Sequence, residues 1–127
     1  MYLLDTNVVC ELRRPDKAAS AVLAWSRAAV ADQLFISSIT VFEIELGVRQ
    51  KERRDATQGR LLRQWLEMQV LPQFQGRVLD VDIAVARRCA ALHSPDSAPE
   101  RDAWIAATAL VHHMTVVSRN TRDFLAC

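Results

Sequence analysis

Residues 1–7 read MYLLDTN, and this short stretch decides how the rest of the chain is interpreted. Tyr2, Leu3 and Leu4 have the character of a short buried β-strand, and the strand runs directly into a carboxylate, Asp5. Two interpretations of Asp5 are open. It can cap a following helix, because Asp is common at that position, or it can supply a carboxylate to a site at the end of the strand.

Three further runs of residues favour β-structure, and segments with helical periodicity lie between the four strands. The further strands are expected at Leu34–Ser37, Arg77–Leu79 and Thr115–Ser118. The helices are expected at Ala18–Val30, Ile39–Arg49, around Leu61, Leu62, Trp65, Leu66 and Val70, at Ile83–His93 and at Glu100–His113. This β-α-α-β-α-α-β-α-α-β order predicts an α/β fold with a short, mainly parallel sheet covered by helices. The length of 127 residues suits one domain, residues 1–127.

Composition excludes several classes of function. The chain has only three glycines, so neither a P-loop nor a dinucleotide-binding fingerprint can be built. Cys10, Cys89 and Cys127 contain no Cys-x-x-Cys pair, so we expect free thiols and no structural zinc site. No apolar run approaches the length of a membrane span, and no signal peptide is visible, so a cytoplasmic protein is expected.

Acidic residues gather where the predicted fold brings strand ends together. Asp5 follows the first strand, Glu43 lies in the opening turns of the helix after the second, and Asp123 follows the fourth. Because ligands of open α/β sheets bind at the carboxyl ends of the strands, these three acids are expected at one edge. Asp102 lies one turn into the helix before the fourth strand, and it joins them only if that helix begins at the same edge.

Each acid also has a purely structural interpretation. Asp5 can be a helix cap, and Glu43 follows Thr40 at the spacing of a capping box. Asp102 can complement a helix dipole, and Asp123 can be a turn residue. However, the helix ERDAWIAATAL is apolar nearly all round, so we expect Asp102 to be buried and to need a partner. Taken together at one edge, the four acids favour a site over four separate structural roles.

Such a cluster of carboxylates predicts a metal site, because the acids repel one another unless positive charge lies between them. Oxygen ligands suit Mg²⁺ or Mn²⁺. These ions activate water and stabilise charge on a phosphate during in-line displacement. The residues alone therefore favour a metal-dependent nuclease.

Four segments resemble motifs of the PIN-domain ribonucleases, specifically the VapC/FitB-like toxins of VapBC-type toxin–antitoxin pairs. They are LLDTN, ITVFEIELG, RDAWIAATAL and SRNTRDF, which occur in the family's order and extend the resemblance over nearly the whole chain. The resemblance implies a PIN-like three-layer α/β/α fold. It also implies a Mg²⁺- or Mn²⁺-dependent endoribonuclease in which an activated water attacks RNA.

Carried over residue by residue, Asp5, Glu43 and Asp102 match three metal-binding acids of the family. Family members place a fourth acid at the position of Asn120 or at that of Asp123. This chain has an acid only at the second, so Asp123 is assigned to the metal site and Asn120 is its polar neighbour.

Two residues next to Asp5 match positions that support the site in the family. Thr6 matches a hydroxyl position, and Asn7 is expected to shape the turn. Family chains usually continue past the Asp-Phe pair into a last short strand, whereas this sequence stops at Cys127. Two explanations are open: the tail is missing from this sequence, or the protein itself is shortened.

The resemblance also implies partners: RNA as substrate, a second copy in a homodimer, and a VapB-type antitoxin that binds DNA in the complex. The antitoxin would insert a segment across the acidic groove, with an arginine in place of the metal. Apolar residues of the early helices can line such a groove or pack in the core: Val22, Leu23, Trp25, Leu61, Leu62 and Trp65. Arginines available for an RNA path are Arg13, Arg14, Arg49, Arg53, Arg54 and Arg60.

Three other functions compete with this interpretation. A haloacid-dehalogenase-type phosphatase would need a second Asp where Asn7 stands, and a receiver domain would need a late lysine, but none follows Lys51. A catalytically inactive PIN-fold protein that acts only by binding its antitoxin stays open.

Overall fold

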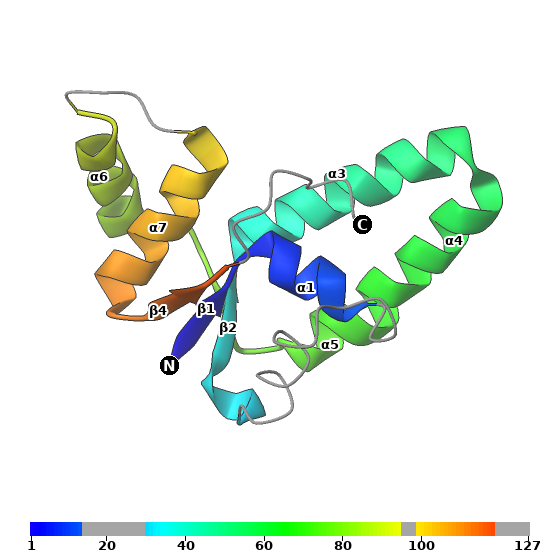
Figure 1. Cartoon of the computed structure of the whole chain (residues 1–127), viewed down its shortest axis with the longest axis horizontal. Helices are drawn as coiled ribbons and strands as arrows, with labels where there is room; N and C mark the ends of the chain where they lie inside the picture. The colour runs from blue at the N-terminus through cyan, green and yellow to red at the C-terminus, as the bar shows by residue number, and fades with distance from the viewer. Residues whose placement is uncertain (14–29, 95–98, 119–127) are drawn as a thin grey trace.

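A four-stranded parallel sheet forms the centre of the computed structural model, which describes residues 1–13, 30–94 and 99–118. The strand order is β3-β2-β1-β4, and each neighbouring pair is parallel (Figure 1). The strands are β1 (Tyr2–Leu4), β2 (Leu34–Ser37), β3 (Val78–Leu79) and β4 (Thr115–Val117). All four predicted strands are confirmed, with β3 and β4 each one residue shorter than expected.

The helices follow the predicted order wherever the chain is described. They are α1 (Thr6–Leu12), the 3₁₀ turn η1 (Ala31–Gln33), α3 (Ser38–Arg54), α4 (Ala56–Trp65), the π-helical η2 (Leu66–Val70), α5 (Leu71–Gln73), α6 (Ile83–Leu92) and α7 (Glu100–His112). Three of these, α4, η2 and α5, follow one another without a break and form the segment predicted around Trp65. The predicted helix Ala18–Val30 lies outside the described residues except for Val30.

Two neighbouring residues of β1 define the layers, because successive side chains of a strand point to opposite faces. Leu3 packs with Ile105 and Ala109 of α7 on one face. Leu4 belongs to the larger cluster on the other face, with Val8 of α1 and Ile44 of α3. Helices therefore cover both faces of the sheet (Figure 1), which confirms the three-layer α/β/α arrangement.

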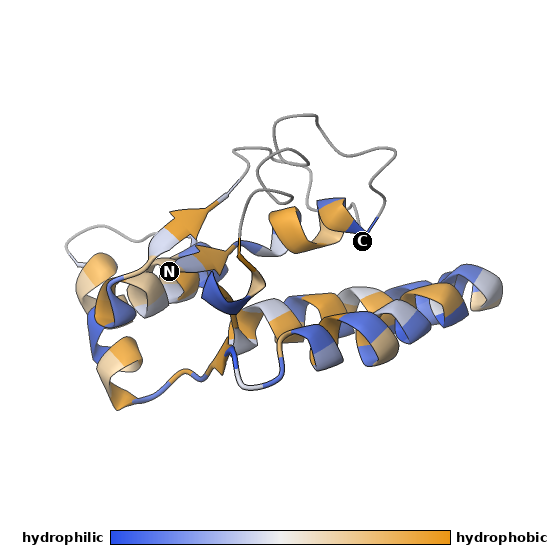
Figure 2. Cartoon of the chain, turned by 90° about the horizontal axis from the view of Figure 1, so that it is seen from below, coloured by the Kyte–Doolittle hydropathy of each residue, from blue (hydrophilic) through white to orange (hydrophobic). Residues whose placement is uncertain are grey.

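Helices α3 and α4 lie antiparallel and extend away from the sheet (Figure 1). Hydrophobic and hydrophilic residues are interspersed along both helices (Figure 2), and Ile44, Val48 and Leu62 face the core. Between the helices, Arg63 pairs with Glu45 at 2.8 Å and with Glu52 at 2.9 Å. The hydrogen bond from Arg63 lowers the pKa of both carboxyl groups.

The cysteines follow the sequence expectation only in part. Cys89 is a buried free thiol, but Cys10 is disulfide-bonded, so the expectation of free thiols throughout is wrong at Cys10. Among the described helices, none combines the length and the apolar character that crossing a membrane requires.

Candidate functional site

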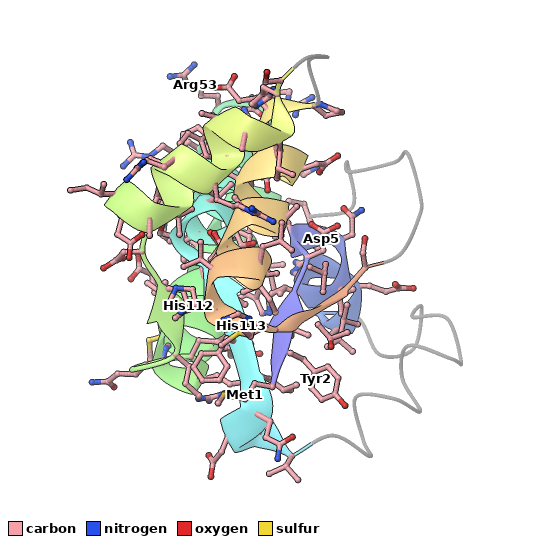
Figure 3. The ribbon with its side chains drawn as sticks, turned by 90° about the vertical axis from the view of Figure 1, so that its left-hand side faces the viewer. Met1, Tyr2, Asp5, Arg53, His112 and His113 are labelled. Carbon is pink, nitrogen blue, oxygen red and sulfur yellow. The ribbon has the colours of Figure 1, made fainter. Side chains whose placement is uncertain are left out.

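The site lies at the point where the strand order reverses. From β1 the chain passes to β2 and β3 on one side and to β4 on the other, so the carboxyl ends of β1 and β4 form the switch point at which α/β proteins bind ligands. Figure 3 shows Asp5 at the end of β1, where α1 begins. Its backbone N–H donates to the carbonyl oxygen of Val117 at 2.9 Å, which joins the two strand ends.

Asp5 fulfils both interpretations suggested by the sequence. Its Oδ1 accepts a 2.8 Å hydrogen bond from the N–H of Thr6, which makes Asp5 the N-cap of α1. Its Oδ2 accepts a 2.7 Å hydrogen bond from the hydroxyl of Ser118, the residue after β4. The side chain is nearly buried, so the strand end and the cap together fix the carboxylate in place.

Glu43 is held by hydroxyl groups rather than by a capping box. The N-cap of α3 is Ser37, whose Oγ accepts from the N–H of Ile39, so the capping interpretation through Thr40 is wrong. Instead, the hydroxyl of Thr6 donates to Oε1 of Glu43 at 2.7 Å. The Oγ1 atoms of Thr6 and Thr40 lie 3.0 Å apart. Because a hydroxyl carries one proton, Thr6 can accept from Thr40 while it donates to Glu43.

Asp102 joins the same edge because α7 begins there. The neighbouring Arg101 brings Nη1 to 3.7 Å from Oε2 of Glu43. Partial desolvation, and second the negative charge of Asp5, raise the pKa of Asp102 above its ordinary value. The expectation that Asp102 is buried is wrong, because it lies in the exposed first turn and burial begins at Ala103.

Three predicted site residues remain, of which the structure describes only Asn7. Asn7 lies within α1 rather than in a turn, and its buried Nδ2 has no hydrogen-bond partner among the described residues. An unsatisfied buried donor costs about 1–3 kcal/mol and is therefore uncommon outside sites. Asn120 and Asp123 lie outside the described residues, so the fourth acid is not placed.

The donor chemistry fits a hard divalent cation. Across residues 1–13, 30–94 and 99–118, no three His, Cys, Asp or Glu side chains are already arranged to hold a metal ion. The acids at this edge nevertheless present only carboxylate oxygens, and hydroxyl groups donate hydrogen bonds to two of them, Asp5 and Glu43. Oxygen ligands of this kind suit Mg²⁺ or Mn²⁺. The residues that would hold the ion are Asp5 and Asp102, whose charges already interact, together with Glu43, which Thr6 orients.

A groove of about 340 Å³ leads away from the acids along α3. Thr6 and Glu43 line its acidic end, and three cations, Lys51, Arg54 and Arg101, also line it. Of the arginines predicted for an RNA path, Arg54 lies here.

Other arginines of that predicted path have different contacts. Arg49 pairs with Glu45 at 2.9 Å, and Arg13 lies over the ring of Trp65. Arg53 and Arg60 are exposed, and Arg14 lies outside the described residues.

Sequence reasoning missed three residues of this region: Ser118, Thr40 and Arg101. Ser118 directly follows the fourth strand, so the rule that placed Asp5 could have found it. The hydroxyl of Thr40 and the guanidinium of Arg101 reach the site only through the packing of helices α1, α3 and α7, for which the sequence carries no local signal.

Comparison with known proteins agrees with this geometry. The PIN domain model matches residues 2–126. Toxin FitB of Neisseria gonorrhoeae is 38% identical over 132 residues, which cover 99% of this chain and 92% of that protein. VapC ribonuclease Y4jK of Sinorhizobium fredii is 38% identical over 136 residues, which cover 99% of this chain and 91% of that protein.

A solved structure has the same fold at similar identity. FitAB bound to an IR36 DNA fragment matches with a TM-score of 0.84 and 37% identity, covering 99% of this chain and 90% of that chain. The family model covers almost every residue, and the acids at the switch point occupy the segments that resemble the family motifs. The chain therefore belongs to the PIN-domain family, in its VapC/FitB-like branch.

Proposed function

We propose that this chain, acting as one PIN domain, is a metal-dependent endoribonuclease and the toxin of a type II toxin–antitoxin system. The observations that support the proposal most are that Thr6 connects Asp5 with Glu43 by hydrogen bonds and that the charge of Asp5 acts on Asp102, at the switch point of a parallel sheet. The names of the relatives, a toxin and a VapC ribonuclease, support it.

The proposed roles follow from the contacts of each residue. Asp5 and Asp102 would hold Mg²⁺ or Mn²⁺, and Glu43, oriented by Thr6, would complete the set with Asp123. When bound, the ion supplies an activated water and charge stabilisation at the phosphate. Ser118 donates a hydrogen bond to Asp5 and Thr6 donates one to Glu43, and these bonds fix the two carboxylates.

The proposed partners are a VapB-type antitoxin that binds DNA in the complex and a second copy of this chain in a homodimer. FitAB is solved on a DNA fragment, which supports the first. The sequence left two uses open for the apolar residues of the early helices, lining a groove or packing in the core. Leu62 and Trp65 are buried and pack in the core. Leu61 and Met68 are exposed and line a separate hollow, which offers apolar surface to a partner. Val22, Leu23 and Trp25 lie outside the described residues.

Cleavage of total cellular RNA by the purified protein tests the nuclease. Wild type is compared with Asp5→Asn, which keeps a good helix cap but removes the charge, and with Asp32→Asn. Asp32 is an exposed acid just before β2, at the opposite edge of the sheet, and serves as the matched control. We expect cleavage by wild type and Asp32→Asn in Mg²⁺ or Mn²⁺, and none by Asp5→Asn or in EDTA.

The other outcomes separate the alternatives. Cleavage that survives both EDTA and Asp5→Asn would indicate a different mechanism or a contaminant. An absence of cleavage from folded wild-type protein in either metal would favour the inactive PIN-fold protein that acts only by binding its antitoxin.

A further inference from the structure

The two oxygens of the Glu43 carboxylate have different neighbours. Oε1 accepts a 2.7 Å hydrogen bond from the hydroxyl of Thr6, which fixes the orientation of the group. Oε2 has a cation beside it instead, because Nη1 of Arg101 in α7 lies 3.7 Å away. This separation is within the range of an ion pair but is longer than a hydrogen bond. Arg101 therefore neutralises Glu43, whereas Thr6 orients it.

Arg101 has a second contact that does not depend on Glu43. Its guanidinium carbon lies 5.0 Å from the centre of the ring of Phe42, an exposed side chain of α3 that is not among the described residues lining the groove. The face of an aromatic ring attracts a cation by itself. The Arg101 side chain is also 48% exposed, whereas that of Glu43 is only 14% exposed. The guanidinium can therefore leave the carboxylate and remain over the ring.

Arg101 brings a positive charge to the edge at which the acids lie. It lines the groove together with Glu43, and the next residue of its helix is Asp102. In the part of the chain that the structure describes, no three acids are already arranged to hold a metal ion. For Asp5, Glu43 and Asp102 to share one cation, their carboxylates must come closer together. The ion pair with Arg101 stabilises Glu43 where it is and opposes that change.

We propose that Arg101 is a built-in competitor of the divalent cation at this site. It neutralises Glu43, and the carboxylate becomes available to a cation only when Arg101 moves back over the Phe42 ring. Its positive charge also repels a divalent cation nearby, so one side chain lowers the affinity of the site in two ways. The inference rests on the proposed function and adds a form of regulation: Arg101 raises the concentration of Mg²⁺ or Mn²⁺ that the acids need.

Binding of Mn²⁺ to the purified protein, measured by calorimetry without RNA, tests the competition. Arg101→Met removes the charge but keeps an unbranched side chain that can pack on the ring. It should bind Mn²⁺ roughly 3- to 10-fold more tightly than wild type, because losing an exposed ion pair alone accounts for up to about fivefold and the lost repulsion adds to it. Arg101→Lys keeps a positive charge and should bind close to wild type. Exposed contacts of this kind contribute little to stability, so both variants should fold.

Three further variants show whether the effect is local. Arg88→Ala removes an exposed arginine of α6 that is not among the described residues lining the groove, and it should leave the Mn²⁺ affinity unchanged. Asp5→Asn should weaken the binding, which would identify the acidic site as the place where Mn²⁺ binds. In a Glu43→Gln background, Arg101→Met should increase the affinity by a smaller factor, because the ion pair is already absent.

The direction of the change distinguishes a competitor from a supporting residue. Weaker binding of Mn²⁺ by Arg101→Met would mean that Arg101 supports the ligands, and it would overturn the proposal. An unchanged affinity, or no binding by wild type and Arg101→Met alike, would overturn it too. So would an equal increase in Arg88→Ala, or an increase of the same size in the Glu43→Gln background.

The metal-binding assay is independent of the cleavage assay. If wild type cleaves RNA in Mn²⁺ but Arg101→Met binds the ion no more tightly, only the competition fails. If Arg101→Met binds Mn²⁺ more tightly but neither protein cleaves RNA, only the nuclease fails.

Discussion

At the scale of single residues, the hydroxyl of Thr6 connects two helices that carry proposed site residues. It lies one residue after Asp5 and donates to Glu43, so it couples the start of α1 to α3 through side chains. The partners are 37 residues apart in the chain. Groups that orient the ligands of a metal typically contribute 10- to 100-fold to affinity or activity.

Thr6→Val should therefore lower RNA cleavage by roughly 10- to 100-fold, because it leaves Oε1 of Glu43 without its donor while keeping the side-chain shape. Thr6→Ser, which keeps the hydroxyl, should retain most of the activity. Initial rates of RNA cleavage at saturating Mg²⁺ measure the effect.

The control for this change is Thr108→Val in α7. Thr108 is also buried, but its hydroxyl donates to the carbonyl oxygen of Trp104 within the same helix. It should cleave RNA at the wild-type rate. Equal losses of cleavage in Thr6→Val and Thr108→Val would mean that Thr6 acts only through stability.

The sequence predicted the positions of the acids better than their surroundings. Asp5 and Glu43 could be placed because strand ends meet at one edge, a rule that needs only the order of the elements. The burial of Asp102 was mispredicted because an apolar helix pattern describes the middle of α7, whereas its first turn projects into solvent. The resemblance implied a supporting role for Thr6, but its bond to Glu43 could not be derived from the residues, because it depends on how α1 and α3 pack.

At the scale of the elements, helices α3 and α4 approach each other closely at Gly59 in α4. A Cβ placed there would lie 2.5 Å from Cα and 2.8 Å from the backbone nitrogen of Glu52 in α3. Backbone atoms cannot rotate away as a side chain can. The antiparallel pair α3 and α4 therefore requires glycine at this position.

Gly59→Ala should destabilise the protein by about 1–3 kcal/mol, because the helices must move apart to accept the methyl group. Thermal unfolding followed by circular dichroism measures the change. Where a helical glycine has free space around it, replacing it by alanine stabilises the helix. A loss of stability at Gly59 would therefore come from the contact with the backbone of Glu52.

Gly47→Ala in α3 provides that comparison. A Cβ at Gly47 would meet nothing within 4 Å, so alanine should stabilise the helix by about 0.5–1 kcal/mol. If both variants shift the melting temperature in the same direction, the close approach at Gly59 does not control the packing of α3 on α4.

Strands were easier to predict than helix boundaries. Each strand is a short run of β-favouring residues, and the predicted first and last residues lie within one position of the observed ones. Helix α1 was suggested only by the capping interpretation of Asp5, because its seven residues are too few to show a period. Helix α3 extends to Arg54 rather than Arg49, because its exposed last turn carries no apolar residue to mark it.

At the scale of the whole molecule, the sheet order places the acids and the groove together at the reversal point of β1 and β4, between helical layers. The layers were predictable from the alternation of strands and helices. The partner surfaces were not, because exposed apolar residues such as Leu61 and Met68 have the same sequence pattern as buried ones.

Expression of the wild-type chain without an antitoxin should arrest bacterial growth, because RNA is cut, and co-expression of a cognate antitoxin should relieve the arrest. Asp5→Asn should allow normal growth at equal expression, whereas Asp32→Asn should remain toxic. Colony counts after induction measure the effect. If Asp5→Asn arrests growth as strongly as wild type, the toxicity does not come from the acidic site.

The bond between Ser118 and Asp5 also has a consequence during synthesis, because its two partners are made at different times. The two residues are 113 positions apart, and β4 is the last of the described strands in chain order. At synthesis rates of about 5–20 residues per second, roughly 6–23 s pass between them. During that interval β1 has no β4 beside it, so Asp5 lacks its Ser118 donor until β4 has been made. Each newly made molecule therefore passes several seconds in which an antitoxin can bind before Ser118 reaches Asp5.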